Sequence, residues 1–302
     1  MQFSIWPDNE RPWEEALSLA RWAEQAGLSG IWYPDHFMSQ PDDMTQPGHD
    51  PAHECWTVLT AIGALVPRLR LVSMVSPVTI HHPVVLAKRA ATLDQIVPGR
   101  VVLGLGAGWQ VNEHQAYGFD LPEPKLRVDR FEEAIDVVHR LLREDQPSFT
   151  GSYYHLDAAT FVPPAPRVRL LVGTAGPRML RLTARFADEW NTWGDPDEVR
   201  RRTALFTAAC EREGRDPATI HRSAQAMIFL TKDDATRDRL KPNVPAARSL
   251  VGGVAEITDL LGAYVEQGVD EFAIPDFTLG KTADARRETL ETLRTEVLPS
   301  FA

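Results

Sequence analysis

Residues 100–119, RVVLGLGAGWQVNEHQAYGF, combine a glycine-rich backbone with side chains that can stack and form hydrogen bonds. Gly104, Gly106 and Gly108 alternate just after a short apolar stretch, which we expect to be a buried strand. A strand that loses its side chains at its carboxyl end can lie flat against a planar group. We therefore interpret this segment as one wall of a cofactor pocket.

The spacing of these glycines argues against two common phosphate-binding motifs. A dinucleotide fingerprint needs G-x-G-x-x-G opening a helix directly, whereas Pro122 here should delay the helix to about Lys125. No Gly-Lys-Ser/Thr follows the glycines, so the segment is not a P-loop. Backbone packed against a planar ring fits better, and Glu113 and His114 are interpreted as support for the loop.

A second glycine segment, Gly173-Thr174-Ala175-Gly176, joins an apolar strand to a helix that Pro177 should open. Free backbone N–H groups and the positive end of the helix dipole make such a turn an anion site, most often for phosphate. The turn could also need glycine for its geometry alone. The neighbouring glycine-rich strand favours phosphate.

His36 is the candidate for proton transfer, because it follows Asp35 at the end of an apolar stretch and imidazole titrates near neutral pH. The alternative is a histidine that caps a turn or binds the edge of a cofactor. Asp35 is interpreted as an orienting or capping residue. Trp109, Trp193 and Phe277 could line a hydrophobic substrate mouth, or could equally belong to the packing of the fold.

Histidine and cysteine patterns predict no metal site. His81 and His82 are adjacent, so their side chains diverge, and HECWT at 53–57 lacks the second histidine of a zinc-protease helix. Cys55 and Cys210 each sit among apolar neighbours, which favours buried thiols over a disulfide.

The elements that must position these residues alternate between short apolar strands and amphipathic helices. Strands are expected at 3–6, 30–33, 69–75, 100–103, 170–172, 189–192, 223–230 and 271–274. Eight alternations without a strong linker predict an α/β fold with a single (β/α)8 TIM barrel, one domain over residues 1–302. A doubly wound sheet with a second domain is the alternative. A small hairpin insertion is expected at about 147–166, and a mobile, irregular loop at about 232–253.

A barrel of this kind carries its site at the carboxyl ends of its strands. The glycine and polar signals fall at those ends, after the second, third, fourth, fifth, sixth and eighth expected strands. This coincidence supports an active barrel.

Composition excludes some classes of partner. The formal net charge of the 302 residues is −10 and no Lys/Arg block occurs, which argues against nucleic-acid binding. No secretory signal and no apolar run of membrane-spanning length is present, so we expect a soluble cytoplasmic protein.

Four segments together resemble the bacterial-luciferase-like flavin and deazaflavin oxidoreductases: PDHF at 34–37, SPVTIHHPVVLAKRAATLDQIVPGR at 76–100, VVLGLGAGWQVNEHQAYG at 101–118, and the RFEEAI helix. The similarity covers most of the chain and looks closest to the branch that uses coenzyme F420, an 8-hydroxy-5-deazaflavin. The resemblance implies a TIM-barrel-like fold with an insertion and a hydride-transfer cofactor lying over the strand ends.

The resemblance also implies roles for particular residues. Ser73, Met74 and Val75 would form a bulge that props the ring, often with a non-prolyl cis peptide. His36 would touch the reactive side, with Asp35 beside the cofactor. The glycine loop, Gly106, Ala107, Gly108 and Trp109, would contact the ring and ribityl chain, and the turn Gly173, Thr174, Ala175 and Gly176 would hold the phosphate.

Trp109 departs from the resembled family, whose sugar-6-phosphate dehydrogenases carry a glutamate there. That acid is missing, so a more apolar substrate than glucose-6-phosphate is expected. Other relatives use FMN and oxygen, which leaves two alternatives: an FMN-dependent monooxygenase fed by a partner reductase, or a flavin-binding barrel without turnover. A homodimer is expected from the resemblance.

Overall fold

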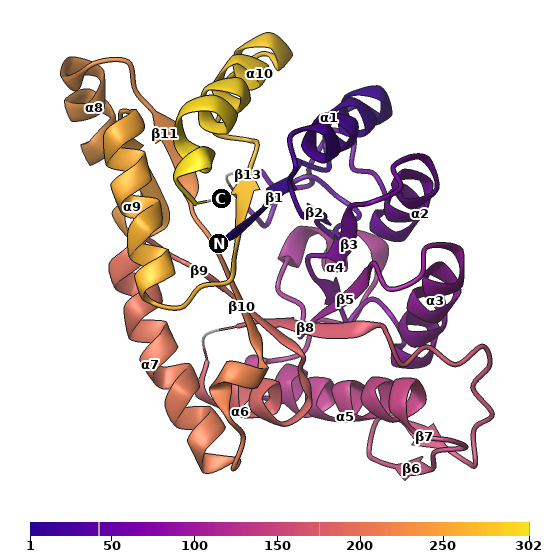
Figure 1. Cartoon of the computed structure of the whole chain (residues 1–302). Helices are drawn as coiled ribbons and strands as arrows, with labels where there is room; N and C mark the ends of the chain where they lie inside the picture. Colours follow the sequence, from indigo (N-terminus) through magenta and orange to yellow (C-terminus); the bar gives the residue numbers. More distant parts are fainter. Residues whose placement is uncertain (42, 175, 302) are drawn as a thin grey trace.

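The computed structural model describes residues 1–41, 43–174 and 176–301. Parallel strands form a closed barrel in which β1 pairs with β13 and β3 pairs with β5 (Figure 1). The eight strands are β1 (Gln2–Trp6), β2 (Gly30–Tyr33), β3 (Arg70–Ser73), β5 (Val101–Gly106), β8 (Arg169–Gly173), β9 (Glu189–Trp193), β10 (His221–Gln225) and β13 (Glu271–Pro275). The predicted (β/α)8 barrel is confirmed.

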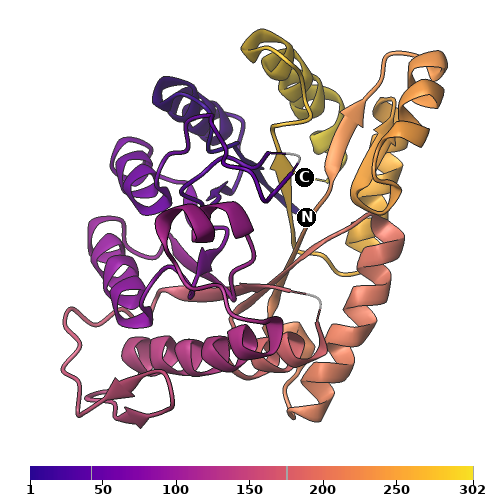
Figure 2. The ribbon, with the colours of Figure 1, turned by 180° about the vertical axis from the view of Figure 1, so that it is seen from behind.

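Helices surround the barrel on its outside, as the two opposite views show (Figures 1 and 2). They are α1 (Trp13–Gln25), α2 (Cys55–Leu65), α3 (Pro83–Ile96), α5 (Pro124–Arg143), α6 (Pro177–Phe186), α7 (Pro196–Arg212), α9 (Val254–Glu266) and α10 (Ala283–Thr292), with short turns η1 (Pro217–Thr219), η4 (Leu293–Val297) and η5 (Leu298–Phe301). Proline opens α3, α5, α6 and α7, where its missing N–H costs no hydrogen bond.

The barrel interior is filled by Trp32, Val72, Val102, Leu171 and Ala273, which form one buried cluster. Trp6, Met74 and Val75 pack on that cluster. The inner core thus packs against residues at the carboxyl ends of β1 and β3. No helix within the described ranges is both long enough and apolar enough to span a bilayer.

One helix was missed by the sequence reasoning. α4 (Val111–Tyr117) begins soon after β5, although the helix was expected only near Lys125. A short helix is possible before Pro122, because Gly118 ends α4 in the left-handed conformation, with φ of 72°. The short strand β4 (Ser76–Pro77) pairs with β5, and the predicted hairpin insertion is present as β6 (Phe149–Thr150) and β7 (His155–Leu156).

The prediction of an irregular loop at about 232–253 is wrong. This stretch contains α8 (Asp234–Leu240), η2 (Lys241–Asn243), η3 (Ala246–Arg248) and β12 (Ser249–Gly252). Asp233 caps α8 by accepting a hydrogen bond from the Thr236 N–H. β12 pairs in parallel with β11 (Met227–Leu230) outside the barrel sheet. The predicted seventh strand is accordingly divided into β10 and β11.

Candidate cofactor-binding cavity

A cavity of about 950 Å³ opens at the carboxyl ends of the barrel strands, a size typical of cofactor sites. Most of the predicted site residues line it: His36, Met74, Val75, Gly106, Ala107, Gly108, Trp109, Gly173, Thr174, Trp193 and Phe277. Asp35, Ser73 and Gly176 do not belong to the lining, and Ala175 lies outside the described residues.

The floor of the cavity forms where β3 ends beside β5. The Met74–Val75 peptide bond is cis, as the resemblance implied. A Cβ on Gly104 would lie 2.0 Å from the Ser73 carbonyl oxygen, and one on Gly106 would lie 2.6 Å from a Val75 methyl group. The end of β3 therefore occupies the space that a side chain would need at both glycines, which corrects the expectation that Gly104 leaves bare backbone for a ligand. Gly106 lines the cavity, whereas Gly104 does not.

Gly108 lies in the loop from β5 to α4 with φ of 88°, and a Cβ there would lie 2.1 Å from Thr79 Oγ1. The same hydroxyl lies 2.8 Å from His114 Nε2. His114 Nδ1 lies 2.6 Å from the Gln110 carbonyl oxygen. His114 therefore supports the loop, as the sequence reasoning expected.

Glu113 of α4 holds His36 at the cavity. His36 Nδ1 lies 2.9 Å from Glu113 Oε1, and Glu113 Oε2 accepts a hydrogen bond from the Phe37 N–H at 2.7 Å. The Glu113 side chain is fully buried. An ionised carboxylate only accepts hydrogen bonds, so Nδ1 carries a proton and Nε2 of the neutral ring is left as an acceptor. Sequence reasoning missed this contact because it depends on α4.

Asp35 is buried but stands outside the lining of the cavity. Its carboxylate accepts a hydrogen bond from Ser76 Oγ at 2.5 Å and lies 3.2 Å from His81 Nε2. Burial alone would raise the pKa of Asp35, but the hydrogen bonds from His81 and Ser76 outweigh it and lower the pKa. An ionised Asp35 thus ties the end of β2 to the segment after β3.

Aromatic side chains form one side of the cavity. Trp6 lies between Trp193 and Phe277, with ring centroids 5.3 and 5.8 Å away. Trp109 meets the His36 ring edge-on at 5.5 Å, and its side chain is 52% exposed. The sequence reasoning missed Trp6, because nothing in β1 marked it as a cavity residue.

The β8–α6 turn is where the sequence predicts an anion site. Gly173 and Thr174 line the cavity, and Gly176 is the N-cap residue of α6. In the part of the chain that the structure describes, no side chain caps this helix. Its first N–H groups are thus available to an anion.

A group of charged side chains lies at the opposite end of the barrel, where the strands begin. Glu189, His221 and Glu271 bring potential ligand atoms within 4.8 Å of one another. Arg70 already donates to Glu271 at 2.5 Å and to Glu189 at 2.6 Å, and Arg169 donates to Glu189 at 2.6 Å. Because these cations occupy the carboxylates, we interpret the group as a charge network that braces the barrel.

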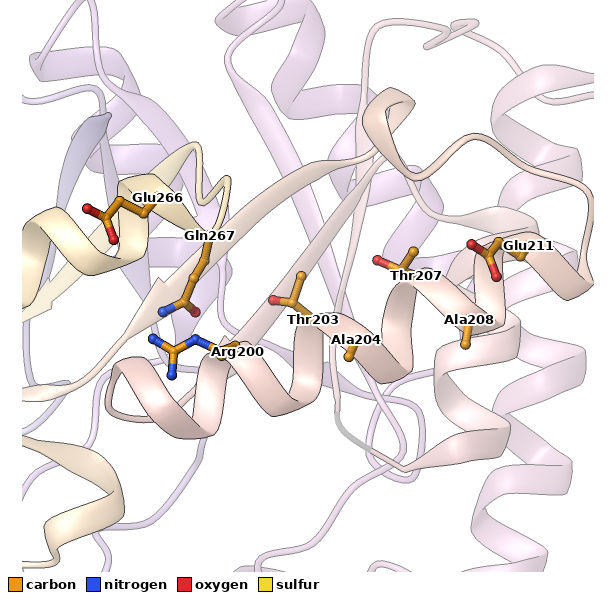
Figure 3. A pocket seen from close by; sticks show the side chains of 8 residues that line it. All are labelled: Arg200, Thr203, Ala204, Thr207, Ala208, Glu211, Glu266 and Gln267. Atoms are coloured by element: carbon orange, nitrogen blue, oxygen red, sulfur yellow. The ribbon is translucent and has the colours of Figure 1, made fainter.

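A separate hollow of about 540 Å³ lies on α7, next to the end of α9. Figure 3 shows that small side chains such as Thr203, Ala204 and Thr207 line it, with Arg200 at one end. It shares no lining residue with the cavity that contains His36. We assign no function to it.

Solved structures confirm the fold. An F420-dependent secondary alcohol dehydrogenase in complex with an F420–acetone adduct has a TM-score of 0.84 at 20% identity, covering 100% of this chain and 99% of that one. The monooxygenase RslO1 from Streptomyces bottropensis has a TM-score of 0.82 at 21% identity, covering 100% of both.

Curated relatives match over part of their length. An F420-dependent glucose-6-phosphate dehydrogenase from Nakamurella multipartita is 37% identical over 180 residues, 59% of this chain and 51% of that protein. An F420-dependent hydroxymycolic acid dehydrogenase from Mycobacterium tuberculosis is 31% identical over 224 residues, 74% of this chain and 61% of that protein. The chain thus spans between half and two thirds of the length of these relatives.

The family model described as luciferase-like monooxygenase matches residues 1–242, which include β1 to β10 of the barrel and most of the cavity. This match covers far more than half of the chain. The chain therefore belongs to the luciferase-like monooxygenase family.

Proposed function

We propose that this protein is an F420-dependent oxidoreductase that transfers a hydride between the deazaflavin and a small organic substrate. The names of the relatives support the choice of cofactor. The observation that carries the proposal is the His36–Glu113 pair, which faces a cavity large enough for a tricyclic cofactor and a substrate.

The residues of the cavity fit this cofactor. Met74, Val75 and the segment 106–109 would contact the ring, while Asp35 and Ser73 would support that floor from behind. Gly173, Thr174 and Gly176 of the β8–α6 turn would hold the phosphate with backbone N–H groups. When bound, the deazaflavin supplies a ring carbon that accepts or donates the hydride.

The side chains of the protein supply proton transfer and shielding. His36 Nε2 takes a proton from a substrate hydroxyl during oxidation, and Glu113 keeps the Nδ1–H in place and stabilises the imidazolium that forms. The aromatic side chains Trp6, Trp193 and Phe277 exclude water from the reaction.

Trp109 shapes the choice of substrate. It contacts the His36 ring at the mouth of the cavity and offers a large, half-exposed apolar surface, where the resemblance implies a glutamate in the sugar-6-phosphate dehydrogenases. We therefore propose a substrate whose reacting carbon carries an apolar group, and not glucose-6-phosphate.

Titration with F420 and with FMN, read by fluorescence, tests the cofactor. We expect F420 to bind and to exchange a hydride with substrate. Binding of FMN alone would favour a two-component monooxygenase supplied by a reductase, and binding without redox exchange would favour a flavin-binding barrel.

Replacement of the proton acceptor tests the mechanism. His36→Asn should lower kcat by about 10²- to 10⁴-fold, the usual contribution of a general base, while F420 affinity stays close to wild type. Full turnover by the variant, with an identified substrate, would contradict the role of His36.

We also propose that the protein is cytoplasmic and forms a homodimer. Both cysteines, Cys55 and Cys210, are free and buried, in keeping with a reducing compartment. Light scattering of the purified protein tests the dimer, and a monomer at micromolar concentration would contradict it.

A further inference from the structure

Two arginines line the cavity on the side that faces His36. Arg202 comes from α7 and Arg248 from η3, next to the carboxyl end of β9. In the closed barrel β9 and β2 are four strands apart in either direction, through β1, β13 and β10 or through β3, β5 and β8. His36 follows β2, so the arginines and the imidazole stand across the mouth from each other.

Arg202 is held in a fixed orientation. Its Nε donates to Glu198 at 2.5 Å and its Nη1 donates to Thr192 Oγ1 at 3.1 Å, while only 17% of the side chain is exposed. Its Nη2 has no hydrogen-bond partner among the described residues. Glu198 also pairs with Arg201 at 2.7 Å, and these arginines hold its pKa at about 2. The Glu198 carboxylate is therefore shared by the guanidinium groups of Arg201 and Arg202, and the three side chains together carry a net positive charge.

Arg248 adds a second guanidinium at the same edge. Its side chain makes no hydrogen bond or ion pair with any residue in the described ranges, and it is exposed to the cavity. The backbone around it is anchored, because the Asp195 N–H donates to the Ala247 carbonyl oxygen at 3.0 Å. This bond ties η3 to the turn between β9 and α7.

We propose that Arg202 and Arg248 bind a carboxylate or phosphate group at the β9 edge of the cavity. β9 pairs directly with β8, with Gly173 opposite Asn191, so this edge lies one strand beyond the turn proposed for the cofactor phosphate. Guanidinium groups with free N–H donors match the geometry of such oxyanions. This inference rests on the proposed function, under which the anion has two possible sources. They are the acidic glutamyl tail of F420 and a charged group on the substrate.

Cofactor affinity separates these sources, because the precursor FO carries the deazaflavin ring without the phosphate and the acidic tail. Arg248→Ala should weaken F420 binding by about tenfold and leave FO binding unchanged, and Arg248→Lys should restore part of the loss. The Arg248 side chain pairs with no residue in 1–41, 43–174 or 176–301, so the variant should remain folded. Arg200→Ala is the matched control: Arg200 belongs to the hollow on α7 in Figure 3, pairs with Asp197, and should affect neither ligand.

Benzoate and its neutral analogue benzamide, titrated against cavity tryptophan fluorescence with and without FO, test the substrate source. If F420 affinity is unchanged but Arg248→Ala weakens benzoate binding and spares benzamide, the site serves an anionic substrate. If the variant binds F420, FO and benzoate like wild type, the arginine site is wrong. Wild-type protein that binds neither F420 nor FO contradicts the proposed function alone, since the benzoate titration without FO still decides the arginine site.

Discussion

His36 and Glu113 illustrate, at the scale of single residues, how burial gives a common pair of side chains a defined chemistry. The carboxylate is removed from water and has two donors, His36 Nδ1 and the Phe37 N–H. A buried acceptor of this kind fixes the imidazole tautomer, with the proton on Nδ1 and Nε2 left as an acceptor.

Glu113→Gln should lower kcat by roughly 10- to 100-fold, since part of the general-base contribution depends on the orientation and charge of the ring. An amide can accept only one of the two hydrogen bonds and brings no charge. The loss should therefore appear in kcat and not in the affinity for F420, because the imidazolium that forms during turnover loses its anionic partner.

Glu113→Asp keeps the charge and serves as the control, with a smaller loss of kcat than Glu113→Gln. Circular dichroism checks that both variants are folded. A Gln variant whose kcat matches wild type would show that Glu113 has only a structural role.

At the scale of elements, the pairing of β3 with β5 explains why β5 has glycine at position 104. Gly104 meets the Ser73 carbonyl oxygen, which is backbone and cannot move aside. Gly176, by contrast, has no neighbour within 4 Å of an added Cβ and an ordinary φ of −74°.

Gly104→Ala should therefore destabilise the protein by several kcal/mol or prevent folding, since the clash separates two barrel strands. Gly176→Ala should change the free energy of unfolding by no more than about 1 kcal/mol. Urea denaturation of both variants measures the difference, and equal stabilities would contradict this account of the strand.

The sequence predicted the alternation of strands and helices well, because hydrophobic period, proline and glycine act locally. Most of the site residues that it singled out line one cavity, since a parallel barrel brings strand ends together. α4 was missed because Pro122 was given more weight than Gly118, and Glu113 was misjudged with it. Arg248 was missed because a polar segment with two prolines gave no sign of its packing against the turn after β9.

At the scale of the whole molecule, the charge network at the amino ends of the strands determines how the stability of the protein depends on pH. Glu271 is fully buried, and although burial alone would raise its pKa, the hydrogen bond from His221 and the charge of Arg70 lower it to about 2. A carboxyl with a lowered pKa contributes stability that is complete above its ordinary pKa of 4.5 and is lost as the pH falls towards 2.

Wild-type protein should thus lose roughly 3 kcal/mol of unfolding free energy from this group between pH 4.5 and 2. Glu271→Gln should cost about 3 to 5 kcal/mol near neutral pH, because Arg70 is left without one of its partners. The difference in unfolding free energy between Glu271→Gln and wild type should become smaller as the pH falls. Urea denaturation at a series of pH values measures both effects. A difference in unfolding free energy that does not change with pH would contradict the lowered pKa of Glu271.

The network also has an evolutionary consequence. Arg70, Glu189 and Glu271 are the first residues of their strands, whereas the cavity residues follow the strands at the far end. Substitutions in two such separated regions are expected to have additive effects on folding. A lineage of this protein can therefore acquire a new substrate through changes at the mouth of the barrel while the dependence of its stability on pH is inherited unaltered.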